Sequence, residues 1–213
     1  MKGVTFGSYH SNTSWGLVLQ SKEIKAPELK INQIDIEGGD GVLDLTDYFG
    51  DVKYKNRSLS FQFVKPGITQ TSFLTLFSQV QNLLHGQKMQ IILDDDPANY
   101  YVGRVTINEW KSDKNLGNIV IEVDAEPYKY KLQETMLSRV VSGSSTIILV
   151  NSRKRVVPSI TTDAEFTIAF GTYSGTFSAG TFMIPELELI EGNNTVTVTG
   201  TGNISFRYRE GGL

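Results

Sequence analysis

The chain has 213 residues, of which 39% are hydrophobic and 20% are charged, so it can form an apolar core and is not a disordered chain. Its formal net charge of −3 argues against stable nucleic-acid binding, which depends on clustered Lys and Arg. The absence of cysteine excludes disulfides, thiolate metal sites and cysteine nucleophiles.

The chain begins without the apolar core of a signal peptide, and no stretch is long enough to span a membrane. We therefore expect that the protein is synthesised in the cytoplasm and does not insert into a membrane. The length fits either one large β domain or two smaller ones.

Alternation of apolar and polar residues dominates the region from Trp15 to Val64. A period of two with one apolar side predicts strands that each bury one face. The alternating apolar residues are Ile31, Ile34, Ile36, Leu59, Phe61 and Phe63.

The segment Gly38-Gly39-Asp40-Gly41 is typical of a loop or hairpin turn, because glycine adopts positive φ at little cost. A phosphate-binding loop would need a helix directly after it. The following Val42-Leu43-Asp44-Leu45 has no helical period, which favours the turn.

One α-helix is predicted from about Thr71 to His85, with Thr69 or Thr71 as its N-cap and Gly86 at its C-terminal end. Its apolar stripe is more typical of packing against a sheet than of a cofactor site. The residues with helical spacing are Phe73, Leu76, Phe77, Val80, Leu83 and Leu84.

Further strands are predicted at 89–93, 100–110 and 118–124, the last two joined by a turn over 112–117. Pro127 ends this pattern. We place a domain boundary close to Leu132, which gives an N-terminal β domain with one helix over 1–132 and a second domain over 133–213.

The C-terminal residues form short β-branched runs separated by Gly, Asn, Ser and Pro, without a helical period. Short strands at intervals of roughly ten residues predict a small antiparallel β-sandwich, so the whole chain is expected to be mainly β. The runs are 146–150, 166–170, 194–198 and 204–208.

No constellation of residues points to catalysis or to a metal. His10 and His85 lack a second ligand at metal-binding spacing, and Asp94-Asp95-Asp96 lacks the spacing of a calcium loop. There is no nucleophile elbow, and no carboxylate pair stands out for glycoside hydrolysis. We therefore predict no enzyme activity, with no catalytic, cofactor-binding or metal-binding residues and no cofactor.

Exposed aromatic residues could instead form a sugar-binding platform, although aromatics in a β-rich protein more often pack in the core. A carbohydrate-binding, lectin-like protein that contacts a host cell surface is therefore the alternative function. The residues concerned are Trp15, Tyr100, Tyr101, Trp110, Tyr173 and Tyr208.

Taken in order, several stretches resemble the distal tail (Dit) family of siphophage tail tips and baseplates. Over the first 131 residues they are 38–46, 54–59, Leu83-Leu84-His85-Gly86, 95–104 and Pro127-Tyr128-Lys129-Tyr130. A looser match in the C-terminal part includes Asn151, Pro158, 192–195 and 206–209.

This resemblance implies a structural virion protein of the bacteriophage tail tip. Its N-terminal domains would form a ring, typically a homo-hexamer, that joins the tail tube protein to the tip or hub protein. Its galectin-like C-terminal β-sandwich would anchor receptor-binding proteins used in host attachment. At this length the second domain has no room for the inserted carbohydrate-binding module of longer relatives.

Three segments are expected to be exposed, irregular and able to meet ring neighbours: 6–15, 38–47 and 94–101. The glycine-rich segment among them could equally be a hairpin surrounded by solvent. The candidate interface residues are Phe6, Trp15, Gly39, Asp40, Asp44, Asp95, Tyr100 and Tyr101.

Overall fold

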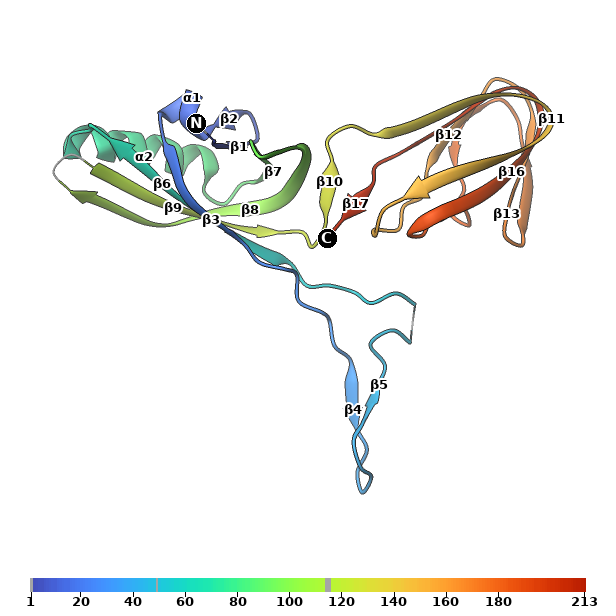
Figure 1. The fold of residues 1–213 in the computed structure, drawn as a ribbon, viewed down its shortest axis with the longest axis horizontal. Coiled ribbons are helices and arrows are strands. Elements are labelled where there is room, and N and C mark those ends of the chain that lie inside the picture. Colours follow the sequence, from blue (N-terminus) through green and yellow to red (C-terminus); the bar gives the residue numbers. More distant parts are fainter. Residues whose placement is uncertain (1, 49, 114–115) are drawn as a thin grey trace. The chain divides into compact units, whose positions relative to one another are not determined.

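A computed structural model describes residues 2–48, 50–113 and 116–213. The chain divides into two compact units, one formed by Met1–Lys129 with Leu213 and the other by Tyr130–Gly212 (Figure 1). Antiparallel strands dominate both units, which confirms the predicted fold class. Lys114 and Asn115, in the turn predicted over 112–117, lie outside the described residues.

The first unit is built on one antiparallel sheet with the strand order β2-β1-β7-β8-β9-β6-β3. In β6 the buried residues Leu59, Phe61 and Phe63 alternate with more exposed ones, as the sequence predicts. The strands are β1 (Val4–Phe6), β2 (Tyr9–His10), β3 (Val18–Ile24), β6 (Arg57–Pro66), β7 (Lys88–Leu93), β8 (Asp96–Asp113) and β9 (Leu116–Ala125).

This sheet curls over its own core. The ring of Phe6 in β1 lies 5.8 Å from that of Phe61 and 6.1 Å from that of Phe63 in β6. Strands β7, β8 and β9 separate β1 from β6 in the sheet, so the contact requires strong curvature. Register shifts after Ile91 and after Ile107 supply the irregularities at which strands bend.

Helix α2 (Gln70–Leu84) packs Phe73, Val80 and Leu84 into this core and confirms the predicted helix. Thr69 caps its start by accepting a hydrogen bond from the Ser72 amide, and Gly86 follows its end with φ of +79°. Beyond the helix, Nδ1 of His85 accepts a hydrogen bond from the Ile107 amide at 3.1 Å. This histidine therefore ties the helix end to β8.

A second, short helix in the first unit corrects the prediction of a single one. Helix α1 (Ser11–Trp15) begins at His10, whose Nδ1 accepts a hydrogen bond from the Thr13 amide, and ends at Gly16 with φ of +63°. Five residues are too few to produce a recognisable helical period. The predicted strand alternation from Trp15 onward is therefore wrong at Trp15 itself, which is the last residue of helix α1.

Between β3 and β6 the chain forms a separate two-stranded sheet of β4 (Gln33–Asp35) and β5 (Val42–Asp44) (Figure 1). We call residues 25–56, which include this hairpin, the arm. No described residue of the arm is buried.

The second unit is a two-layer arrangement around the long strand β16 (Gly192–Tyr208), which pairs with β11 (Thr135–Asn151) over its whole length. Strand β13 (Phe166–Phe170) pairs with one half of β16 and β12 (Ser159–Thr162) with the other half. The remaining strands are β14 (Tyr173–Phe177) beside β13, β15 (Gly180–Met183) beside β12, and the short pair β10 (Lys129–Lys131) and β17 (Gly211–Gly212).

The ribbon of β11 and β16 bends where Gly143 lies opposite Gly200. A Cβ atom on Gly200 would lie only 2.6 Å from Cδ1 of Phe166, so this position has no room for a side chain. Beyond the bend, the backbone and side-chain nitrogens of Asn203 each donate to Asp163 at 2.6 Å. The expectation of separate strands at 194–198 and 204–208 is therefore wrong, because the glycines bend one continuous strand.

Buried Glu210 joins the two ends of this unit. It accepts hydrogen bonds from Nζ of Lys131 at 2.6 Å, Oγ1 of Thr135 at 2.6 Å and Oγ of Ser152 at 2.7 Å. Burial opposes ionisation, but the hydrogen bonds from these three residues outweigh it and hold the pKa of Glu210 below its usual 4.5.

This carboxylate should make the second unit sensitive to acid. Because the pKa is lower in the folded state, its contribution is complete above the unfolded pKa and disappears as pH falls through the folded pKa. We expect the protection of β11 and β16 peptides against hydrogen exchange, expressed relative to the intrinsic exchange rate at each pH, to fall below about pH 4.5 more steeply in the wild type than in Glu210→Gln. Equal pH dependence in the two proteins would show that Glu210 is not the sensitive group.

Candidate assembly interface

The arm exposes apolar side chains to an unusual degree. Seven large apolar residues on it have exposed fractions between 46% and 71%. Scattered exposed leucines are ordinary on a protein surface, but a continuous group is typical of an interaction site. The seven residues are Leu29, Ile31, Ile34, Ile36, Val42, Leu43 and Tyr48.

Backbone hydrogen bonds give the arm a defined hairpin structure. Ile34 lies opposite Leu43, and the Gly39 amide donates to the Ile36 carbonyl at 3.1 Å in the turn. Gly38 and Gly41 there have φ of +78° and +79°, conformations that favour glycine. Because an isolated two-stranded hairpin is only marginally stable in water, this one is expected to gain stability from a partner.

Asp44 stabilises the base of the hairpin. It accepts hydrogen bonds from the Thr46 amide at 2.9 Å and from Nε2 of Gln33 at 3.1 Å. Bonds from the Thr46 hydroxyl, the Thr46 amide and Gln33 lower the pKa of Asp44 below its usual 3.8. The carboxylate is therefore ionised at neutral pH.

The arm is also strongly acidic. Residues 31–52 contain six Asp and Glu residues and no Lys or Arg, so this segment alone carries a formal charge of −6. The whole chain carries −3, which leaves +3 on the remaining residues. The segment 31–52 of one copy, which is the middle of the arm, is therefore complementary in charge to the remaining residues of another copy. The acids are Asp35, Glu37, Asp40, Asp44, Asp47 and Asp51.

The candidate interface residues fall into two groups. Gly39, Asp40 and Asp44 lie together on the exposed arm. Phe6 and Trp15, with exposed fractions of 0% and 9%, belong instead to the core of the first unit. Their expected exposure is wrong, because segment 6–15 folds into a strand end, a tight turn and helix α1.

The segment 94–101 is likewise not an irregular loop. Leu93 pairs with Asp96, so Asp94 and Asp95 form a tight turn and β8 starts immediately after it. Pro97 is tolerated because it stands at the beginning of the strand. Tyr100 and Tyr101, expected to be exposed, are buried.

The three acids at this turn have separate sets of partners. Asp94 accepts from the Gly3 amide at 2.6 Å and lies 3.1 Å from Nε2 of His10. Asp95 forms an ion pair with Lys22. Asp96 accepts from Asn99 at 2.6 Å and from Lys129 at 2.9 Å. Their carboxylates therefore do not converge on a common point.

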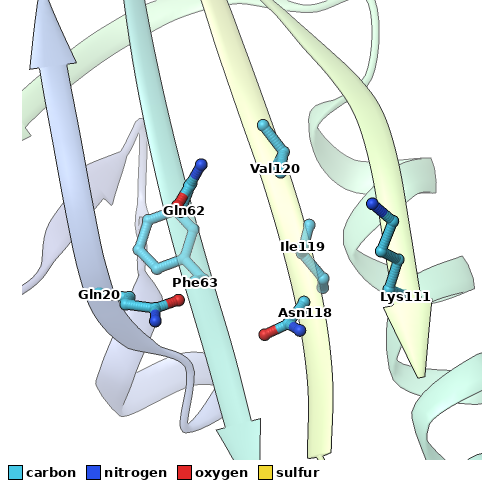
Figure 2. A pocket seen from close by; sticks show the side chains of 7 residues that line it. All are labelled: Gln20, Gln62, Phe63, Lys111, Asn118, Ile119 and Val120. Atoms are coloured by element: carbon cyan, nitrogen blue, oxygen red, sulfur yellow. The ribbon is translucent and has the colours of Figure 1, made fainter. Parts of the chain in front are cut away.

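The outward face of the first sheet carries a hollow of about 170 Å³ that lies across β3, β6, β9 and β8 (Figure 2). The described lining holds amides, apolar groups and one lysine, and neither a carboxylate nor an imidazole that could act as a general base. The lining residues are Gln20, Gln62, Phe63, Lys111, Asn118, Ile119 and Val120.

Within residues 2–48, 50–113 and 116–213, no three His, Cys, Asp or Glu side chains gather as a metal site would require, and no helix is long and apolar enough to cross a membrane. Of the aromatics considered as a sugar platform, Trp15, Tyr100, Tyr101 and Tyr208 are buried. Trp110 packs against Phe73 and Phe77, with ring centroids 6.0 Å and 5.5 Å away.

No family model and no curated protein matches this chain. Its structure is similar to a crystal structure of the Dit protein of phage SPP1, described as a paradigm of the hub adsorption apparatus in phages that infect Gram-positive bacteria. The TM-score is 0.72 at 16% sequence identity, and the match covers 98% of this chain and 99% of that one. The resemblance drawn from the sequence is thereby confirmed at the level of the fold.

Proposed function

We propose that this chain is a distal tail protein: a structural subunit of a siphophage tail tip that forms a ring, joins the tail tube to the tip or baseplate hub, and resides in the virion. The full-length likeness in fold to a phage hub protein supports this role. The described lining of the hollow, which holds one lysine but neither a carboxylate nor an imidazole, gives no support to a catalytic role.

The observation that carries the ring is the exposed apolar arm. Ile34 and Ile36 on the arm alternate with polar residues in the same way as Leu59, Phe61 and Phe63, which are fully buried in the core. Fully burying one such side chain contributes about 1.5–3 kcal/mol, so covering several of them against a neighbour supplies a substantial driving force. A pattern designed for burial but left open in one copy favours burial between copies.

The charges favour a head-to-tail arrangement. The segment 31–52, with its charge of −6, is repelled by the same segment of another copy and attracted to the other residues of that copy, which together carry +3. Contacts between two different surfaces of the same chain close into a ring when the rotation between copies permits. We propose six copies, with Gly39, Asp40 and Asp44 at the contact between neighbours.

The two units would then have different roles in the tail tip. The first unit, with the arm, would form the ring and contact the tail tube protein and the tip or hub protein. The second unit would hold peripheral receptor-binding proteins during host attachment. This division extends the family resemblance to a chain with the same two-part organisation.

Light scattering of the purified protein over a range of concentrations tests the ring. We expect a mass of six times 23.7 kDa, or a multiple of it, and dissociation at high salt because screening weakens the attraction of the arm. A monomer at every concentration would contradict ring formation by the free protein and would assign the arm to another tail protein.

A further inference from the structure

The second unit has a long open sheet edge. Within the part of the chain that the structure describes, β11 pairs with β16 alone, so one side of this 17-residue strand has no strand neighbour. Unpaired amides and carbonyls along such an edge readily accept another strand. The Val150 carbonyl, near the strand end, already accepts a hydrogen bond from the Tyr208 hydroxyl.

The sequence of β11 lacks the features that usually protect an edge. It contains neither lysine nor proline, and Arg139 is its sole charged residue. Four apolar side chains on its outer face are largely exposed: Met136 (67%), Val140 (82%), Ile148 (55%) and Val150 (55%). This edge is therefore suited to pairing with an apolar strand rather than to permanent contact with water.

The strand has matching residues about Gly143 at its centre and toward both ends. Ser142 and Ser144 flank the glycine, and Met136 and Val150 stand at equal distances on the two sides. The inward-facing Leu137 and Leu149 are related in the same way. These three pairs would meet if the strand paired antiparallel with a copy of itself.

From the open edge and these three matching pairs we infer that β11 pairs with β11 of a second copy, antiparallel, about a two-fold axis midway between the two Gly143 residues. The axis stands perpendicular to the sheet, so both outer faces remain on the same side. Met136 then lies opposite Val150 of the other copy, and Ser142 opposite Ser144. Arg139 lies opposite Ile147 and not opposite Arg139 of the other copy, so the pairing brings no like charges together.

The bend of the ribbon is compatible with this pairing. It occurs at Gly143, beside the axis, and the two-fold rotation carries the bend of one ribbon onto the bend of the other. The two ribbons can therefore curve together as one sheet.

This contact is independent of the proposed ring. A two-fold contact of this kind cannot relate neighbours that follow one another around a single ring, so it would join copies from two rings. It would also cover an exposed edge in the free protein before a tail is built.

Cysteine cross-linking tests the register, because the natural chain contains no cysteine and gives no background. In the double variant Met136→Cys/Val150→Cys, each new cysteine lies opposite one from the other copy. Oxidation should therefore yield covalent dimers on a non-reducing gel. In the matched control Ser144→Cys/Val150→Cys, the two cysteines are out of register and should remain unlinked.

A second measurement uses the most exposed side chain. Val140→Lys adds a charge to the edge, should leave the fold unchanged, and should halve the solution mass of the wild type. Dimers in the register variant but not in its control, together with this halved mass, support the pairing. Absence of cross-links at all concentrations, equal cross-linking of the control, or an unchanged mass overturns it. An arm variant that abolishes the ring should still cross-link, so failures of the two proposals can be told apart.

Discussion

Replacing Ile34, Ile36 and Leu43 with serine should abolish the ring while leaving both units folded. These side chains are about half exposed in a single copy, so their removal costs little within it. At a neighbour contact each loss removes up to about 1.5–3 kcal/mol, and every 1.4 kcal/mol weakens association about tenfold. Light scattering should show the loss of the six-copy species.

The matched control replaces exposed leucines elsewhere. Leu74, Leu83 and Leu132 have exposed fractions of 38–42% and lie outside the arm. Their triple change to serine removes a similar amount of exposed apolar surface and should retain the ring. If the control dissociates as readily as the arm variant, general loss of apolar surface, and not the arm, explains the result.

Phe61→Ala should produce the largest loss of stability in the first unit, about 3–5 kcal/mol. Phe61 is fully buried, with its ring 5.8 Å from that of Phe6 and 6.3 Å from that of Phe63. Its removal opens a cavity between the two sides of the curled sheet. Denaturant unfolding followed by tryptophan fluorescence measures this unit alone, because both tryptophans, Trp15 and Trp110, belong to it.

Two further variants separate this effect from general destabilisation. Phe61→Leu fills most of the cavity and should cost less than the alanine variant. Phe206→Ala removes an equally buried ring from the second unit and should leave the tryptophan transition in place. A shift of that transition by Phe206→Ala would show that the two units unfold together.

The sequence predicted which segments form strands better than it predicted whether the apolar face of each segment is buried in the core or exposed. Alternation correctly predicted β6, in which Leu59, Phe61 and Phe63 are buried. The same reasoning failed for Ile31, Ile34 and Ile36, which are exposed in this chain. Periodicity shows that one side of a strand is suited to burial, but it does not distinguish the protein's own core from the surface of a neighbour.

Turn-forming residues were ambiguous in a similar way, because they did not show how long each turn or loop is. The two glycines at 200 and 202 looked like a break between strands, and they bend a single strand because β11 continues to pair along both halves. Asp94, Asp95 and Pro97 indicated a loop of eight residues, whereas the chain reverses within a tight turn. Local composition marks a change of direction, and only pairing with distant residues determines its length.

Of the candidate interface residues, those on the arm are exposed as the sequence predicts, whereas the four aromatic residues are buried. The glycines and acids of 38–47 favour a solvated hairpin through their own conformational preferences. Phe6, Trp15, Tyr100 and Tyr101 are suited equally to a core or an interface, and the curled sheet encloses three of them, Phe6, Trp15 and Tyr101, in its core. That curl depends on contacts between β1 and β6, which are far apart in the chain.

The pairing of β11 with β16 also determines when each unit can fold during synthesis. The first unit is complete, apart from Leu213, once Lys129 has left the ribosome. The central ribbon of the second unit joins 135–151 to 192–208, so β11 must wait for translation of nearly the whole remaining chain. Such long-range pairing is slow to form and leaves apolar strands exposed meanwhile. Nascent chains stalled before residue 192 should therefore contain a protease-resistant first unit and a degradable second one.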